Sequence, residues 1–298
     1  MLTWDAGHRI DLRATLAPLR RGSGDPAHRW DDGRFWRTCL TPDGPGTLAL
    51  SAADTVVAAQ AWGPGADWLL ARVPVMLGRD DDWSALDVTS HRVLHETSRR
   101  LAGLRLVSTG LVFDALVPAV LEQKVTGLEA RRSWRLMLHR FGTPAPGPHE
   151  DLRVMPSPRT LLDLPSWEWH RLGVDHKRQR TIRAAASVAR RLDEAAAMSH
   201  ADAAARLLLV PGVGVWTAAE TTQRALGDPD AISVGDYHLK NMVVHLLTGR
   251  ARGTDDEMVE LLGAWPGQRQ RVMRLIEATG VRAPRYGPKF NYTDIRAL

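Results

Sequence analysis

Cysteine is almost absent from this 298-residue chain, which has Cys39 alone. One cysteine forms no internal disulfide and supplies too few thiolates for an iron–sulfur cluster or a cysteine-ligated zinc site. No run of apolar residues is long enough to cross a membrane as a helix. The first residues, MLTWDAGHRI, lack the apolar segment of a secretory signal peptide. These absences predict a protein of the reducing cytoplasm with no membrane partner.

Lysine is also scarce, because arginine supplies nearly all of the 39 cationic side chains. The formal net charge of +5 favours a polyanionic partner such as nucleic acid, although many basic proteins bind nothing anionic. The arginine excess would suit phosphate recognition, since a guanidinium forks onto a phosphate. Codon bias is the simpler explanation of the excess, because alanine is abundant too.

The residues that are present divide the chain into two parts. Apolar runs at 35–40 and 47–50 flank a Pro/Gly turn, which is typical of a β-hairpin, and 55–62 predicts a third strand. Residues 66–77 then predict a helix. Beyond residue 87 the strand signals stop and apolar residues recur at the helical spacing. The stretches predicted to be helical are 91–101, 112–141, 158–164, 168–172, 176–192 and 201–210. The sequence therefore predicts a mostly α fold with an N-terminal α+β domain at 1–85 and a helical domain at 86–298.

The most informative segment lies between residues 201 and 241. The helix predicted over 201–210 stops at Pro211, Gly212, Val213 and Gly214, and a new helix begins directly afterwards. Two glycines one residue apart permit a tight turn with exposed N–H groups, and these groups form an anion site together with the N-terminus of the next helix. An ordinary connection between two helices would have the same sequence.

A carboxylate opens the next helical stretch, in the sequence VGDYHLK that contains Asp236. Taken alone, Asp236 is most simply a helix N-cap, a position where aspartate is strongly preferred. Its combination with the Gly-rich turn is more specific. The order LVPGVG, WTA and VGDYHLK resembles that of the helix-hairpin-helix DNA glycosylases, and within them the bacterial 3-methyladenine DNA glycosylase II branch. The likeness extends over residues 114–280 and implies the helix-hairpin-helix glycosylase fold with the N-terminal α+β domain of that branch.

The resemblance also implies roles for individual residues. Asp236 matches the catalytic aspartate, Trp216 matches an aromatic residue of the pocket for the extruded base, and the hairpin of Pro211, Gly212, Val213 and Gly214 is expected to grip a DNA phosphate. Family members bind a monovalent cation at the hairpin through main-chain carbonyls. The matching carbonyls are those of Leu208, Val210 and Val213. The resemblance implies no other cofactor, so Na⁺ or K⁺ is the one candidate.

Three positions depart from the family pattern or divide its subclasses. Gln123 and Lys124 match the loop that enters the DNA gap, where the usual wedge is apolar. Lys124 either reaches a phosphate or the orphaned base, or is a solvated charge. Glu220 replaces a pocket aromatic and either favours a cationic base or pairs with an arginine outside the pocket. Trp216 stands where glycosylases with lyase activity have a nucleophilic lysine.

Two further groups of residues were assigned more broadly. Seven basic side chains lie between residues 171 and 191, either as an outward basic face or as contacts to the DNA backbone. Four of the 11 tryptophans are expected in the core. These tryptophans are Trp134, Trp167, Trp169 and Trp265.

These residues predict a monofunctional DNA glycosylase that hydrolyses the N-glycosidic bond of alkylated purines in double-stranded DNA, in base-excision repair. Such an enzyme rotates the damaged nucleotide out of the duplex, and an electron-rich ring favours the cationic alkylated base. A carboxylate then stabilises the oxocarbenium character of the sugar. We expect a monomer in the cytoplasm that associates with the nucleoid. The alternatives are a glycosylase for another modified base and a non-catalytic helix-hairpin-helix DNA-binding protein.

Overall fold

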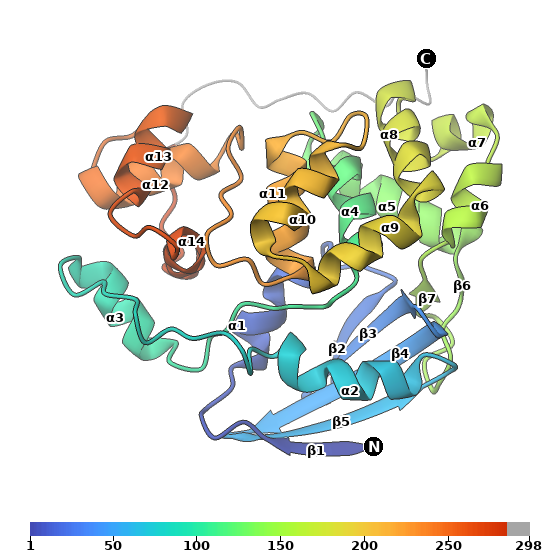
Figure 1. Cartoon of the computed structure of the whole chain (residues 1–298), viewed down its shortest axis with the longest axis horizontal. Helices are drawn as coiled ribbons and strands as arrows, with labels where there is room; N and C mark the ends of the chain where they lie inside the picture. Colours follow the sequence, from blue (N-terminus) through green and yellow to red (C-terminus); the bar gives the residue numbers. More distant parts are fainter. Residues whose placement is uncertain (285–298) are drawn as a thin grey trace.

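The computed structural model describes residues 1–284, and its N-terminal part is an antiparallel sheet (Figure 1). The order of its five strands is β1-β5-β4-β3-β2. The strands are β1 (Leu2–Asp5), β2 (His28–Asp31), β3 (Arg34–Thr41), β4 (Gly44–Ala53) and β5 (Val56–Trp62). Phe35 pairs with Leu50 across the predicted hairpin, which is confirmed together with the third strand. The two edge strands, β1 and β2, were not predicted because each is only four residues long and partly polar.

One face of this sheet is covered by α2 (Ala66–Met76), at the position predicted for a helix. Leu69 and Val73 of α2 pack with Leu48 and Leu50 of the sheet in one apolar cluster. The short helices α1 (Leu12–Leu16) and η1 (Ala17–Leu19) contribute Leu16 and Leu19 to the same cluster. The sheet and these helices thus have an apolar core of their own.

The helical stretch predicted over 112–141 is two helices, α4 (Val112–Leu121) and α5 (Gly127–Phe141), so the prediction of a continuous pattern was wrong there. Thr126 forms a capping box with Glu129, in which each side chain accepts a hydrogen bond from the other residue's backbone N–H. Lys124 has a left-handed backbone, with φ +54°. The left-handed residue Lys124 and the capping box of α5 separate the two helices. Residues 122–126 form the loop between them.

Up to residue 210 the other helices follow the predicted stretches with two differences, whereas the helices at 255–262 and 269–278 were not predicted. They are α3 (Arg92–Arg100), α6 (Pro158–Asp163), α7 (Ser166–Arg171), α8 (His176–Ser187), α9 (Ala189–Asp193), η2 (Glu194–Ala197), α10 (His200–Leu208), α11 (Val215–Ala225), α12 (Leu239–Thr248), α13 (Asp255–Leu262) and α14 (Arg269–Ala278). The stretch 176–192 is divided at Val188 into α8 and α9. A two-stranded sheet of β6 (Thr143–Pro144) and β7 (Arg153–Val154) lies in the region predicted to have no strands. No helix in residues 1–284 is long and apolar enough to cross a membrane.

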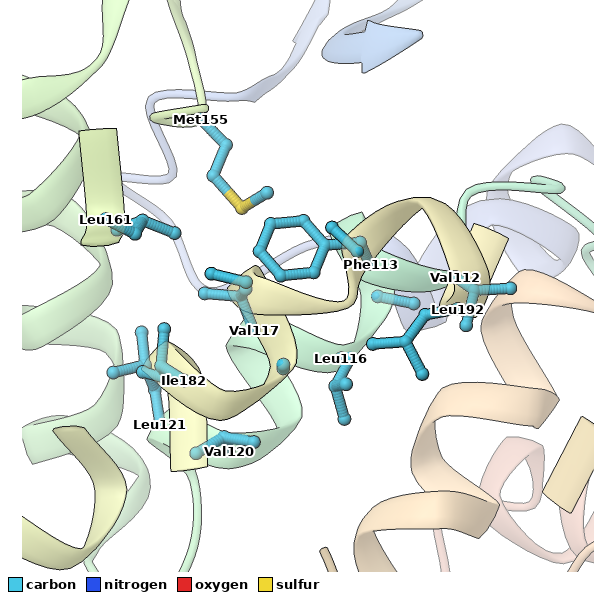
Figure 2. Packing of buried hydrophobic residues seen from close by; sticks show 14 of the residues in the cluster. Val112, Phe113, Leu116, Val117, Val120, Leu121, Met155, Leu161, Ile182 and Leu192 are labelled. Atoms are coloured by element: carbon cyan, nitrogen blue, oxygen red, sulfur yellow. The ribbon is translucent and has the colours of Figure 1, made fainter. Parts of the chain in front are cut away.

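Helix α4 lies at the centre of the largest apolar cluster. Figure 2 shows its side chains Phe113, Val117 and Leu121 among those of Ile182 on α8 and Leu192 on α9. Of the tryptophans predicted to be core, two are confirmed: Trp134 and Trp169 are buried here. Trp265 is partly buried against a different cluster. Trp167 is 62% exposed, so that prediction was wrong.

A third apolar cluster joins distant parts of the sequence. Val88, Leu94 and Leu104, from the segment around α3, pack with residues of α12, α13 and α14. In Figure 1 these elements stand to the left of α10 and α11, with the sheet below. Helix α11 contributes Ala218 and Ala225 to the largest cluster and carries the candidate residues Trp216 and Glu220.

Candidate functional site

The hairpin connects α10 to α11, and its two glycines serve different purposes. Gly212 has φ +90°, and a Cβ atom there would collide with the side chain of Thr181 on α8. Gly214 has an extended backbone, with φ −102° and ψ −179°, and a Cβ atom there would meet nothing within 4 Å. The fold therefore requires glycine at 212, whereas the bare backbone at 214 leaves the surface open to a partner.

The loop at 122–126 is fastened to this hairpin. The Gln123 Nε2 donates hydrogen bonds to the carbonyl oxygen of Gly212 (3.0 Å) and to the hydroxyl of Thr217 (2.8 Å). Gln123 therefore braces the loop against the hairpin. The next residue, Lys124, is exposed at the tip in the left-handed conformation. Backbone of this kind is uncommon for a lysine and is found preferentially at functional sites.

Asp236 has both a structural contact and an unused oxygen. Its Oδ1 accepts hydrogen bonds from the backbone N–H groups of His238 (2.8 Å) and Leu239 (2.9 Å), at the start of α12. Within residues 1–284 its other oxygen, Oδ2, has no hydrogen-bond or ion-pair partner, and the residue is half-buried. The side chain thus caps the helix and also presents a carboxylate oxygen outward.

The turn before Asp236 is held by a residue that sequence reasoning missed. The backbone N–H of Gly235 donates to Oδ1 of Asp255 (2.8 Å), and Lys240 Nζ donates to Oδ2 (2.7 Å). Partial burial works against the charge of Asp255, but these two donors lower its pKa. Asp255 is the first residue of α13. No local pattern relates it to Gly235, so only the fold reveals the contact.

One face of α11 carries Trp216, Glu220 and Gln223, spaced so that they lie along the same side of the helix. Trp216 is partly exposed. The Glu220 carboxylate accepts a hydrogen bond from the hydroxyl of Ser233 (2.5 Å) and pairs with Arg224 (2.8 Å). Burial raises the pKa of Glu220, but the charge of Arg224 and the Ser233 hydrogen bond outweigh it and lower the pKa. Glu220 is therefore ionised at neutral pH.

Below this face lies a cavity of about 290 Å³, bounded by α11, α14, η1 and the start of the 122–126 loop. Its lining is strongly polar, and many of the charges pair with one another. The pairs are Arg21 with Glu122 (2.8 Å), Arg224 with Glu220 (2.8 Å) and Arg274 with Glu277 (2.5 Å). No aromatic side chain from residues 1–284 lines this cavity. Glu220 pairs with Arg224, and both residues line the cavity, so the choice between its two predicted roles stays open.

Main-chain carbonyls are the donors expected for a monovalent cation. The carbonyl of Val210 accepts the N–H of Val213 (3.0 Å), which brings two of the three expected donors into one turn. A carbonyl oxygen has two lone pairs, so this hydrogen bond leaves the Val210 oxygen able to bind a cation. Residues 1–284 contain no cluster of His, Cys, Asp and Glu that could hold a metal ion. The residues therefore fit a weakly held, hard monovalent ion bound by uncharged oxygens.

Large apolar side chains are exposed around these groups. Leu209 (82% exposed) and Val215 flank the hairpin, Tyr237 (74% exposed) follows Asp236, and Leu128 lies just beyond the 122–126 loop. Exposed apolar groups clustered around polar functional residues are typical of a surface that meets a partner. No sequence motif predicts that these apolar side chains are exposed, because apolar residues next to helix ends usually pack inside.

The basic side chains at 171–191 divide into two sets. Arg178 and Arg183 donate to backbone carbonyls inside the protein, including those of Leu121 and Leu164. They are structural and are not free to bind a phosphate. Lys177 is exposed one turn before Thr181, the residue that packs against Gly212. Lys177 thus lies one helical turn from the residue that packs against the hairpin.

Comparisons with known proteins agree with this geometry. No family model matches the chain. The chain is 31% identical over 217 residues to a protein of Mycobacterium tuberculosis named as a probable bifunctional transcriptional activator/DNA repair enzyme AlkA, which covers 70% of this chain and 43% of that protein. The chain thus spans less than half of the relative's length.

Solved structures show the fold. A 3-methyladenine DNA glycosylase from Archaeoglobus fulgidus aligns with TM-score 0.73 at 14% identity, covering 94% of this chain and 99% of that one. An 8-oxoguanine glycosylase/lyase from Clostridium acetobutylicum, bound to DNA, aligns with TM-score 0.69 at 10% identity, covering 91% of both chains. The chain has the helix-hairpin-helix DNA glycosylase fold, as the sequence motifs predicted. Within that superfamily, its sequence similarity is to the AlkA-type repair enzyme, so the predicted resemblance is confirmed.

Proposed function

We propose that this protein is a DNA glycosylase that hydrolyses the N-glycosidic bond of alkylated purines in damaged double-stranded DNA. The observation that supports it best is Asp236 itself, which keeps one carboxylate oxygen unpartnered within residues 1–284 while the other caps the start of α12. The proposed place of action is the nucleoid, in base-excision repair.

Binding would begin at the hairpin, because its backbone N–H groups and the N-terminus of α11 suit a DNA phosphate. Gly214 lets the phosphate approach the backbone closely, since no side chain intervenes. Lys124, on the loop braced by Gln123, would enter the gap left by the extruded nucleotide. The extruded base would then lie against Trp216, with the cavity beyond it.

The chemical step would rely on charge. Alkylation at N3 or N7 makes a purine cationic, and the ring of Trp216 favours such a base by about 0.5–2 kcal/mol. As the bond from C1′ to the base nitrogen breaks, the sugar becomes positive. The Asp236 carboxylate would stabilise that charge and orient the attacking water. The hydrogen bonds to His238 and Leu239 hold the carboxylate in place throughout.

We also propose that the enzyme has no lyase activity. A lyase step needs an amine that attacks C1′, and the position of the lysine in bifunctional glycosylases is occupied here by Trp216. Lys240 follows Asp236 in the sequence, but its ammonium group is bound to Asp255. Lys124 lies on the gap-entering loop. A Na⁺ or K⁺ ion, if required, would be held by the carbonyls of Leu208, Val210 and Val213.

The test uses double-stranded DNA methylated to contain alkylated purines, with unmethylated DNA of the same sequence as control. We expect free alkylpurines to be released from the methylated DNA alone, and the strands to break only after alkali treatment. Borohydride should trap no covalent adduct between protein and DNA. Absence of base release would refute the glycosylase assignment. An adduct that disappears in Lys124→Ala would show that Lys124 is a nucleophile.

A further inference from the structure

Gln270, in the first turn of α14, has a side chain that the fold does not use. It lines the cavity below Trp216 and Glu220 and is only 7% exposed. Its side-chain amide has no hydrogen-bond partner within residues 1–284. A polar side chain in the wall of a cavity is nearly always bonded to protein, water or ligand. The amide of Gln270 is therefore available to a group inside the cavity.

The neighbouring polar groups of α11 are already engaged. Both carboxylate oxygens of Glu220 are bonded, one to Ser233 and one to Arg224. The amide nitrogen of Gln223 donates to the carbonyl of Ala231 (3.1 Å) and the hydroxyl of Ser233 (3.0 Å). Gln270 differs from them because both its donor and its acceptor remain unused. It is the cavity residue best suited to recognise a bound base.

The position of Gln270 is fixed relative to Asp236. Its backbone N–H donates to the carbonyl of Pro229 (2.9 Å). The preceding Arg269 donates from its backbone and its side chain to Asp230, at 3.1 Å and 2.7 Å. The first turn of α14 is thus anchored to the segment that leads from α11 to Asp236. The backbone that carries Gln270 is thus held to the same segment that carries Asp236, while its side-chain amide stays free to bind a group in the cavity.

We propose that Gln270 reads the extruded base through two hydrogen bonds and thereby discriminates alkylated adenine from alkylated guanine. The inference rests on the proposed glycosylase function. A glutamine amide pairs with the N6 amino group and N7 of adenine, donating to N7 and accepting from N6. Adenine alkylated at N3 keeps both groups. Guanine alkylated at N7 has lost the N7 acceptor and has an oxygen where adenine has the amino group. Gln270 should therefore favour adenine alkylated at N3 over guanine alkylated at N7.

The experiment measures initial rates of release of 3-methyladenine and of 7-methylguanine from the same methylated duplex. Wild-type protein should favour 3-methyladenine. Gln270→Ala should lower its release about 10- to 100-fold, the worth of a bidentate base contact, and should change release of 7-methylguanine by about threefold or less. Gln270→Glu should lose 3-methyladenine release too, because a carboxylate cannot donate to N7.

Two controls separate recognition from a structural role. Gln268→Ala removes a glutamine two residues away that accepts from Arg271 and does not line the cavity, and it should leave both rates unchanged. Binding of Gln270→Ala to abasic-site DNA should equal that of wild type, because no base is present. Equal loss for both bases, or weaker binding to abasic DNA, would overturn the proposal while leaving the glycosylase function intact. Release of neither base by wild-type protein would instead refute the glycosylase function.

Discussion

Two aspartates in different regions of the molecule show how structural and candidate functional groups differ. Asp25 lies at the junction between the sheet and α5 and is 5% exposed. Its Oδ1 accepts from Trp134 Nε1 (2.8 Å) and the N–H of Ala27 (3.0 Å). Its Oδ2 accepts from the N–H of Arg21 (2.7 Å) and contacts the Nδ1 of His28 (3.1 Å). Every oxygen of Asp25 is therefore occupied by the protein itself.

Asp236 belongs to a more open region, where one oxygen is bonded to the backbone and the other is unpartnered within residues 1–284. The exposed Leu209 and Tyr237 surround this region, whereas the junction around Asp25 is closed. Both residues are aspartates, so the residue type alone does not determine whether a carboxylate is structural or functional. A carboxylate whose hydrogen bonds are all made within the chain stabilises the fold, and one with an unused oxygen is available for chemistry.

The largest effect on stability should follow from removing Asp25. Asp25→Ala leaves the buried donors of Trp134, Ala27 and Arg21 without partners, so the free energy of unfolding should fall by about 3–5 kcal/mol. Asp236→Ala removes only a helix cap and should cost about 1 kcal/mol. Urea titrations of both variants beside wild type measure the difference. Similar losses of stability for the two variants would contradict the difference between Asp25 and Asp236.

The next effect concerns Asp255, which holds the turn of Asp236. Asp255→Ala releases the N–H of Gly235 and should slow base release about 10- to 100-fold through misplacement of the carboxylate. Asp255→Asn keeps an acceptor for Gly235 and should recover most of the activity. Single-turnover release and binding to abasic-site DNA are measured, and binding should change little.

Glu257→Ala is the matched control, because Glu257 caps the same helix through Thr254 and does not contact the turn of Asp236. It should release bases at the wild-type rate. If Asp255→Ala also does so, Asp255 does not position the carboxylate.

The pH dependence of stability should show the contribution of Asp25, which lies at the junction between the sheet and α5. Burial raises the pKa of Asp25, but the charge and hydrogen bond of His28 and the hydrogen bond from Trp134 outweigh it, so the pKa lies well below its usual range. A carboxyl with a lowered folded-state pKa stabilises the fold above its unfolded pKa of about 4 and loses that contribution as the pH falls through the folded value. The urea concentration at the wild-type unfolding midpoint should therefore decrease as the pH is lowered below about 4. Asp25→Asn should show a weaker fall, and parallel curves would contradict the assignment.

The smallest effect should come from Gly214. Gly214→Ala places a methyl group on open surface without backbone strain, so the fold should be unchanged. The methyl group would obstruct a phosphate at the hairpin and weaken binding to any DNA sequence about fivefold, the worth of one hydrogen bond. Affinity measured over a salt series should fall steeply for both proteins through counterion release. Unchanged affinity in Gly214→Ala would show that the hairpin is only a turn.

The sequence predicted the parts of this molecule that depend on local chemistry. The β3–β4 hairpin, the turn at Gly212 and Gly214, and the start of α11 are set by glycine, proline and alternation of apolar residues within a few positions. The family motif located Asp236. The apolar spacing alone did not show the break between α4 and α5, because it runs through the break and the capping box of Thr126 and Glu129 is a weak signal, whereas the family resemblance implied a loop at Gln123 and Lys124.

Other features depend on contacts between distant residues. Asp255 reaches Gly235 from another helix, and Gln270 lines a cavity that also involves α11 and η1. Nothing in the neighbouring sequence of either residue indicates the contact. Trp167 was assigned to the core by residue type, but it lies on the outer side of a six-residue helix and is exposed.

The most direct test of the account is base release from methylated DNA by Asp236→Asn. An asparagine oxygen can accept the same hydrogen bonds from His238 and Leu239, so the cap is retained and only the charge is lost. We predict a fall of about 10²- to 10³-fold in single-turnover release. Binding to abasic-site DNA and the urea midpoint should remain at the wild-type values. Release at the wild-type rate would contradict the account and leave Asp236 as a helix cap alone.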